Sequence, residues 1–205
     1  SEQLASLYDM FLEKFPDDDD AVASRAWVLA SMGLADVAIG DLERVCGDDR
    51  GSDIQIERLM HLYNDKLATR DDHAIRFKLV KLLVRRGRVD EAINILQQLA
   101  SIDSFRLRSL QALGFCFWQK GMHYLAWQKF QQLPLNDEVR DILYRLAVDM
   151  EDTEQILNAK SVWQHLSEAD SNYRDVAQRL RKADQQLKSQ NFAFTPDQDQ
   201  SAAVA

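Results

Sequence analysis

The sequence has little glycine and little proline, with seven Gly and three Pro in 205 residues. A fold of many short strands needs more turn-forming residues, so this scarcity argues against an all-β protein. No apolar run approaches the roughly 18 residues that a membrane-spanning helix requires, and we expect no membrane insertion. Because 46% of the residues are hydrophobic, the chain can still bury a sizeable core and is not disordered.

Cysteine is scarce as well. Cys46 and Cys116 stand 70 positions apart in apolar, helical contexts, and the sequence has no CxxC motif. We expect two buried thiols that behave as small hydrophobic side chains rather than a disulfide. This favours a reducing compartment such as the cytoplasm and leaves a bacterial periplasm open. The chain starts at Ser1 without a signal peptide, and we expect it to be a segment of a larger protein or assembly.

Positive charge is also in short supply, since 33 acidic residues outnumber 25 basic ones and the net charge is −8. This argues against a general nucleic-acid binder, and we expect no nucleic acid as a partner. The charge is unevenly distributed: it is −10 (7 basic, 17 acidic) over residues 1–72, +7 (10 basic, 3 acidic) over 73–133, and −5 (8 basic, 13 acidic) over 134–205. The basic middle segment indicates either a docking feature for an acidic partner or a solvated basic helix face.

Catalytic and metal-binding motifs are missing too. The sequence contains no glycine-rich phosphate loop, GxSxG or HExxH, and its four histidines lack ligand spacing. The four carboxylates from Asp17 to Asp20 could suggest a metal site, but a run of this kind after Pro16 is more typical of a helix N-terminus. We therefore expect no enzyme, no cofactor and no metal.

What the sequence does have is helical periodicity. Apolar residues recur at steps of three and four almost throughout, which indicates short helices joined by short connections. The predicted fold class is therefore all-α. We predict eleven helices, within residues 4–16 and at about 20–32, 35–46, 53–68, 73–86, 89–100, 104–120, 123–133, 137–150, 154–168 and 172–188.

A repeat emerges when the segments are aligned on Gly33, Gly87 and Gly121, each of which ends one helix before the next begins. An alanine follows five residues later and a large residue four residues after that. The pairs are Ala38 and Leu42, Ala92 and Leu96, and Ala126 and Phe130; a fourth copy has Glu154 in the glycine position, followed by Ala159 and Trp163. The glycine permits the turn, the alanine lets two helices approach closely, and the large residue fills the gap between them.

This pattern resembles the tetratricopeptide repeat (TPR) family, whose unit is a helix–turn–helix of 34 residues. Gly87 and Gly121 are 34 residues apart, and the best copy carries the family's Leu-Gly pair at Leu113-Gly114. The resemblance implies a right-handed helical-repeat solenoid of short antiparallel helices, with a single domain over residues 1–188. Its expected parts are a half repeat at 1–18, repeats at about 19–52, 73–106, 107–139 and 140–172, a capping helix at 173–188, and a flexible C-terminal tail at 189–205.

One stretch departs from the repeat. Gly33 and Gly87 lie 54 residues apart, which is 34 plus 20. Residues 53–68 fit the first helix of a unit, but no second helix follows before residue 73. We therefore predict an irregularity near 53–72, with either one helix left without a hairpin partner or a change of direction in the array.

In proteins that resemble this family, the first helix of each unit lines a concave groove. Transferred to this chain by position, the groove residues are Trp27, Phe77, Lys81, Arg85, Arg108, Gln111, Phe115, Trp118 and Tyr144. Aromatic faces with basic and amide groups between them suit a peptide with apolar anchors and some acidic character. The alternative is that individual aromatic residues pack between neighbouring helices, and for Trp118 both interpretations are open.

The sequence thus favours a non-enzymatic scaffold that binds a peptide or protein partner through an aromatic and basic groove. Two alternatives remain: a helical-repeat module that binds RNA, and a self-association module in which the exposed half repeat docks on a second copy. The Lys/Asn set with which some members of this family bind C-terminal carboxylates is absent at these positions, so we do not predict a chaperone-tail receptor.

Overall fold

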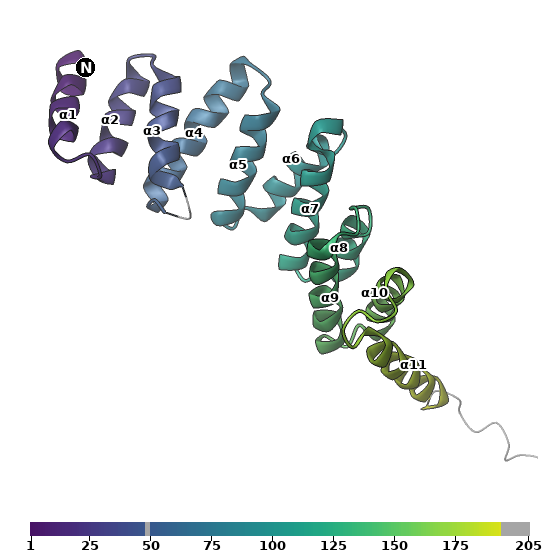
Figure 1. Cartoon of the computed structure of the whole chain (residues 1–205). Helices are drawn as coiled ribbons and strands as arrows, with labels where there is room; N and C mark the ends of the chain where they lie inside the picture. The colour runs from purple at the N-terminus through teal and green to yellow at the C-terminus, as the bar shows by residue number, and fades with distance from the viewer. Residues whose placement is uncertain (48–49, 194–205) are drawn as a thin grey trace, which may run out of the picture. The chain divides into compact units, whose positions relative to one another are not determined.

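The structure, a computed structural model, describes residues 1–47 and 50–193, and within these ranges it is all-α without a strand (Figure 1). The helices are α1 (Glu2–Lys14), α2 (Asp19–Ser31), α3 (Ala35–Cys46), α4 (Asp53–Thr69), α5 (His73–Arg85), α6 (Val89–Leu99), α7 (Asp103–Gln119), α8 (His123–Phe130), α9 (Asp137–Asp152), α10 (Ile156–Ala169) and α11 (Val176–Ala193). The predicted all-α helical-repeat fold is confirmed. No described helix combines the length and the apolar character that crossing a membrane requires.

Helix boundaries differ from the prediction mainly near the C-terminus. Helix α8 ends at Phe130 rather than near 133, because residues 131–133 form turns. Helix α11 begins at Val176 rather than near 172, since residues 171–175 form turns and Arg174 has a left-handed φ of 47°. It extends to Ala193, and the rest of the predicted flexible tail lies outside the described residues.

The four predicted repeat turns share one backbone geometry. Gly33, Gly87 and Gly121 have left-handed φ angles of 81°, 72° and 71°, and Glu154 adopts the same conformation at 60°. At each turn the following residue donates its N–H to a carbonyl five residues earlier, which is the Schellman arrangement for ending a helix. These bonds, of 2.8–3.0 Å, are Leu34 to Leu29, Arg88 to Leu83, Met122 to Phe117, and Gln155 to Met150. The alignment of the repeats on these four positions is confirmed.

The core lies between the two helices of each hairpin. The alanine and large-residue positions of the repeat are completely buried: Ala38, Leu42, Ala92, Leu96, Ala126, Phe130, Ala159 and Trp163. Gly114 shows how closely the helices approach, because a Cβ atom there would lie 2.3 Å from Cε1 of Phe130. A large side chain on one helix therefore interlocks with a small one on the other.

The chain divides into two compact units, Ser1–Arg106 and Leu107–Ala205. In the first unit each helix from α1 to α6 contacts the next, and α2 also contacts α4. In the second unit α8 contacts α9, α9 contacts α10, and α10 contacts α11. The single domain expected over residues 1–188 stays a prediction.

Helix α4 is the irregular element. It begins with its own capping box between Ser52 and Gln55 and ends at Thr69, and the next residue, Arg70, is extended at φ −149° and ψ 129°. The connection to α5 has no left-handed residue; instead, the side chain of Asp72 accepts hydrogen bonds from the backbone N–H groups of Ala74 and Ile75. Helix α4 is therefore not joined to α5 by the turn that defines the repeats, and the predicted irregularity takes the form of a helix without a hairpin partner.

Two smaller predictions are also confirmed. The acidic run before α2 caps that helix, because the Asp18 carboxylate accepts a hydrogen bond from the Ala21 N–H at 2.8 Å. Cys46 and Cys116 are both buried. Burial raises the pKa of both thiols, as expected for cysteines that serve as small core residues.

Candidate functional site

The nine predicted groove residues are divided between the two units. Trp27, Phe77, Lys81 and Arg85 lie in the first unit. Arg108, Gln111, Phe115, Trp118 and Tyr144 lie in the second. A groove that runs through all nine stays a prediction, and each unit is considered by itself below.

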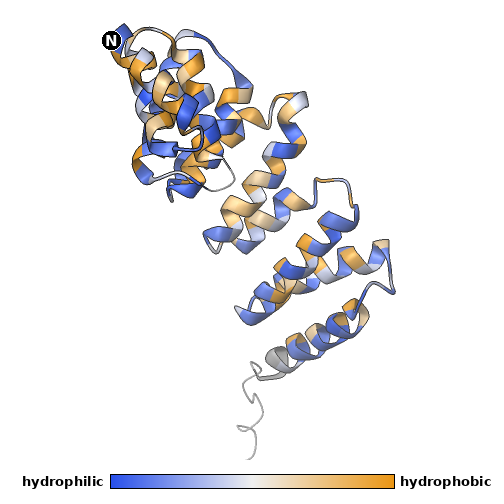
Figure 2. Cartoon of the chain, turned by 60° about the vertical axis from the view of Figure 1, so that its left-hand side comes forward, coloured by the Kyte–Doolittle hydropathy of each residue, from blue (hydrophilic) through white to orange (hydrophobic). Residues whose placement is uncertain are grey.

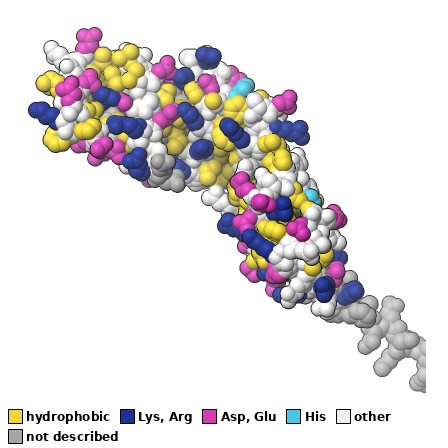
Figure 3. Space-filling model, viewed as in Figure 1, with side chains coloured by type: hydrophobic (Ala, Val, Ile, Leu, Met, Phe, Trp, Pro, Cys, Tyr) yellow, Lys and Arg dark blue, Asp and Glu magenta, His cyan; other side chains and the backbone are white. Residues whose placement is uncertain are grey.

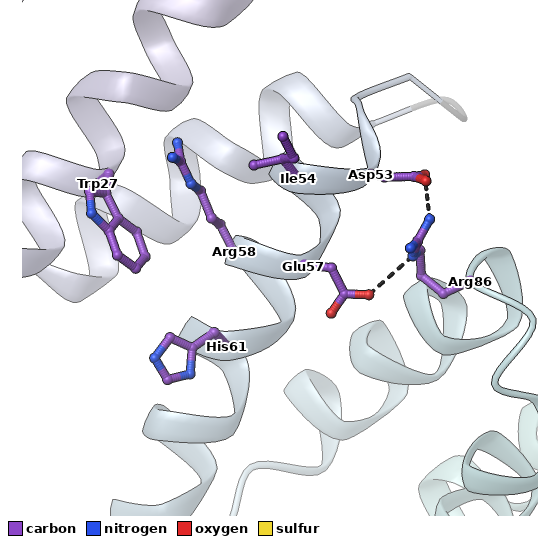
Figure 4. Close-up of a pocket in the computed structure, with 7 residues that line it drawn as sticks. All are labelled: Trp27, Asp53, Ile54, Glu57, Arg58, His61 and Arg86. Atoms are coloured by element: carbon purple, nitrogen blue, oxygen red, sulfur yellow. Dashed lines mark hydrogen bonds and ion pairs between the residues drawn. The ribbon is translucent and has the colours of Figure 1, made fainter.

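One candidate site in the first unit is a pocket beside Trp27. This side chain projects from α2 with 45% of its surface exposed. The adjoining pocket has a volume of about 420 Å³. It is lined by Trp27, Asp53, Ile54, Glu57, Arg58, His61 and Arg86 (Figure 4). Ile54 is 66% exposed, so the pocket offers two large apolar side chains to solvent.

Helical spacing explains how α4 builds most of this pocket. Ile54, Glu57, Arg58 and His61 follow the i, i+3, i+4, i+7 pattern and share one face of the helix. The other face of α4 is buried in the first unit, through Ile56, Leu59, Met60, Leu62 and Tyr63. Exposed pocket residues and buried core residues thus come from opposite sides of the same helix.

Sequence reasoning found Trp27 but missed the α4 residues, because the stretch 53–72 was treated as an interruption of the repeats. A signal was present. Residues 53–68 fit the first helix of a unit. The second, fifth and ninth positions of such a helix, which hold groove residues in the other units, are Ile54, Glu57 and His61 here.

The charges around the pocket are only partly balanced. Arg86 forms ion pairs with Asp53 and with Glu57, the latter at 3.1 Å, and these hydrogen bonds raise the pKa of its guanidinium. Arg58 lies 5.2 Å above the centre of the Trp27 ring. Among the residues that the structure describes, Arg58 has no carboxylate partner. One positive charge beside the apolar floor is therefore available to a ligand.

The other predicted residues of the first unit have mixed surroundings. Arg85 donates hydrogen bonds to the carbonyl oxygens of Cys46 and Arg50, at 2.7 and 2.6 Å, and so holds the connection between α3 and α4. Phe77 is half-buried and packs against Phe105, with 6.3 Å between the ring centres. Lys81 is exposed, and within the described residues it has no ion-pair partner.

In the second unit, Phe115 and Trp118 lie together on α7. Their rings are nearly parallel, at 8°, with 6.3 Å between centres, and both meet the buried Phe130 edge-on. Phe115 is exposed and Trp118 is half-buried. The indole N–H of Trp118 donates to Oδ2 of Asp149 at 2.6 Å, which links α7 to α9. Trp118 thus has a packing contact, and Phe115 is the more accessible of the two rings.

The same carboxylate belongs to a small polar network. Oδ2 of Asp149 lies 2.9 Å from Nε2 of His123, and the Gln155 amide nitrogen lies 2.7 Å from Nδ1 of that ring. When the amide donates to Nδ1, the histidine carries its proton on Nε2 and donates it to Asp149. This arrangement joins the turn before α10 to α8 and α9.

Tyr144 is enclosed by the C-terminal part of its unit. Its hydroxyl donates to Asp175 at 2.6 Å, and its ring meets Trp163 edge-on at 5.2 Å. The guanidinium of Arg174 lies 4.7 Å above the ring. These contacts fit the packing alternative for Tyr144. Of the remaining predicted residues, Gln111 donates to Glu138 at 3.0 Å, and Arg108 is exposed.

Within the described parts of the chain, no group of three or more His, Cys, Asp or Glu side chains is arranged to hold a metal ion. The arrangement of the candidate site is suited to contact and binding: an apolar floor, a paired acidic and basic rim, and one unpaired guanidinium.

No protein-family model matches the sequence, and no curated protein matches it. Solved structures do match. The chain is similar to the C-terminal part of a TPR repeat-containing protein from Cytophaga hutchinsonii, with 19% identity over 91% of this chain and 66% of that one and a TM-score of 0.46. It is similar to the MamA protein, with 19% identity over 82% of this chain and 94% of that one and a TM-score of 0.48. It is also similar to YrrB, a TPR protein with an unusual peptide-binding site, with 16% identity over 87% and 99% of the two chains and a TM-score of 0.41. Its four matching turns and buried repeat positions show that the chain has the all-α helical-repeat fold that its resemblance to TPR proteins predicts.

Proposed function

We propose that this chain is a non-enzymatic scaffold that binds a peptide or protein partner through the Trp27 pocket. The observation that carries the proposal is the exposed Trp27 beside the exposed Ile54, over a pocket of about 420 Å³. Tryptophan is enriched among the residues that dominate binding energy, because it buries a large apolar area at a small entropic cost. Covering Trp27 and Ile54 by a partner would remove that area from water.

The chemistry of the pocket indicates the kind of ligand. Its apolar floor suits one or two hydrophobic side chains. Arg58 beside the floor lacks a carboxylate partner within the described residues, so an acidic group next to the anchor would pair with it. Arg86 is already engaged by Asp53 and Glu57. We therefore propose a peptide segment with an apolar anchor and an acidic residue close to it in sequence.

The second unit supports binding of the same kind at the exposed Phe115, with Arg108 and Gln111 on the same helix. RNA binding is the alternative at this pocket, and the net charge of −8 over the chain argues against it. Polyuridine binding at low salt that is lost in Trp27→Ala would favour RNA over a peptide.

The proposal can be tested with a displayed library of random peptides selected on the full chain. We expect the selected peptides to share an apolar residue and a nearby Asp or Glu. Trp27→Ala should weaken their binding about 30-fold, which corresponds to about 2 kcal/mol. Arg58→Gln should reduce the preference for the acidic residue without abolishing binding.

Leu157→Ala is the matched control, because Leu157 is 66% exposed on α10 and lies in the other unit. It should leave affinity unchanged. Selected peptides that bind Trp27→Ala as tightly as the unmodified chain would contradict the proposal.

A further inference from the structure

Helix α1 has an apolar face that no described residue covers. Leu4, Leu7 and Phe11 are 47%, 61% and 42% exposed. A second side of α1 buries Ala5 and Leu12 where the helix contacts α2. Figure 3 shows hydrophobic side chains gathered around the N-terminal helices. The helix therefore has apolar residues on two sides, and packing uses one of them.

The repeat register explains why this face is apolar. As the second helix of a half repeat, α1 places Leu4, Tyr8 and Phe11 at the positions that α3 fills with Ala38, Leu42 and Val45. These three α3 residues are completely buried, in a helix that packs against α2. The same positions in α10, Ala159, Trp163 and Leu166, are also completely buried. In α1, Leu4 and Phe11 stay exposed and Tyr8 is half-buried, because no described helix occupies the place that α2 takes against α3.

The open face forms one wall of a groove between α1 and α2. The groove has a volume of about 450 Å³. It is lined by Leu4, Leu7, Tyr8, Phe11, Asp18, Asp20, Ala21 and Ser24. Within the repeats α2 itself packs against both α3 and α4. A helix lying against α1 and α2 would take the equivalent position one step earlier in the array.

The acidic charge around this groove indicates which kind of helix it can bind. Residues 1–20 contain seven acidic residues and one basic residue, Lys14. Asp9 is already paired with Arg25 at 2.8 Å, whereas Glu2, Glu13 and Asp17 have no ion-pair partner among the described residues. A second copy that docked its own α1 in the groove would bring an equally acidic helix to the same place and be repelled. A basic helix would be attracted.

We propose that the groove between α1 and α2 binds an amphipathic, basic helix of a partner protein. Its apolar stripe would cover Leu7 and Phe11, and its Lys or Arg residues would lie along the acidic edges. A small residue would face Tyr8, as Gly114 faces Phe130 in the best repeat. This site does not involve the Trp27 pocket and does not depend on the function proposed for it.

A synthetic peptide can test the proposal on the full chain. The probe is a fluorescein-labelled peptide of about 18 residues, or five helical turns, with Leu and Ala on one face and Lys on the other. One matched peptide replaces Lys by Glu, and another scrambles the order so that the apolar stripe is lost. Measured by fluorescence anisotropy, the amphipathic Lys peptide should bind at least about tenfold more tightly than either.

Variants of the chain then locate the binding site. Leu7→Ser should weaken binding of the Lys peptide about tenfold, while Leu157→Ser, at a residue that is similarly exposed on α10, should not change it. Trp27→Ala should also leave this affinity unchanged. Circular dichroism should show the same helix content for all variants, because each changes an exposed side chain.

Three results would overturn the proposal. One is equal binding of the Lys and Glu peptides, and another is equal binding by Leu7→Ser and the unmodified chain. The third is a dimer in sedimentation equilibrium that Leu7→Ser dissociates, which would assign the α1 face to a second copy.

Discussion

The first and last helices of the described chain differ in what they expose. Helix α11 buries Val176 and Ala183 and is otherwise rich in Arg, Lys and Gln, as its mainly hydrophilic colours in Figure 2 show. Helix α1 buries Ala5 and Leu12 and exposes a further row of apolar residues. Terminal helices of repeat arrays need a polar outer face to keep the array in solution. The polar surface of α11 fits its predicted role as a capping helix, whereas the apolar row on α1 is the surface that we propose binds a partner helix.

The two helices are also anchored differently. Arg179 of α11 pairs with Glu151 at 2.6 Å and with Asp175 at 2.9 Å, and its guanidinium lies 5.4 Å from the centre of the Trp163 ring. Helix α1 has one ion pair with α2, between Asp9 and Arg25, in addition to its apolar contacts. The predictions below test this contrast, from the largest expected effect to the smallest.

The clearest test compares the same repeat position in the two helix types. Trp163→Ala should lower the free energy of unfolding by about 3–5 kcal/mol, because Trp163 is fully buried and donates a hydrogen bond to Glu151. Tyr8→Ala should cost less than half as much, since Tyr8 is only half-buried. Urea denaturation followed by circular dichroism measures both. Equal losses in the free energy of unfolding would contradict the distinction between the buried position in α10 and the half-buried position in α1.

A second test addresses the close packing of a large side chain against a small one, which α1 lacks. Gly114→Ala should destabilise the chain by about 1–3 kcal/mol, because the added Cβ would collide with the Phe130 ring. Gly40→Ala is the control: nothing lies within 4 Å of a Cβ there, and it should stabilise α3 by roughly 0.5–1 kcal/mol. Thermal unfolding of the two variants should shift in opposite directions. A neutral Gly114→Ala would show that the hairpin is looser than described.

A third test asks whether Trp118 packs between helices or binds a ligand. Trp118→Phe preserves the stacking on Phe115 and removes the hydrogen bond to Asp149, so we expect a loss of about 1 kcal/mol of stability. Affinity for selected peptides should stay the same if Trp118 serves packing. Unchanged stability with a tenfold loss of affinity would place Trp118 among the ligand anchors instead.

The smallest expected effect is on the stability of the chain at low pH, through Asp175. The hydrogen bond from Tyr144, together with Arg179, lowers the pKa of Asp175. A carboxyl group with a lowered pKa in the folded state adds stability above its unfolded pKa of about 3.9, and this stability is lost as the pH falls through the folded value. Asp175→Asn should therefore flatten the loss of stability below about pH 4, by less than about 1 kcal/mol because the side chain is partly exposed.

The sequence was most informative where structure is decided locally. The turns at Gly33, Gly87 and Gly121 follow from backbone conformations that glycine favours, and Glu154 was placed by its spacing alone. The partners of half-exposed side chains were not predictable in this way. Tyr144 meets Asp175 across 31 positions, and Arg85 meets the Cys46 carbonyl across 39. Such contacts depend on how helices pack, which the pattern within one helix does not specify.

Helix α4 both interrupts the repeat period and builds most of the Trp27 pocket. Removing residues 53–72 would bring Gly33 and Gly87 to 34 residues apart, the same spacing as Gly87 and Gly121. Five of the seven residues that line the Trp27 pocket lie in α4. A chain without this segment would retain Trp27 and its repeats but would lack most of the pocket. The segment 53–72 therefore accounts both for the break in the repeat period and for most of the surface that we propose binds the partner.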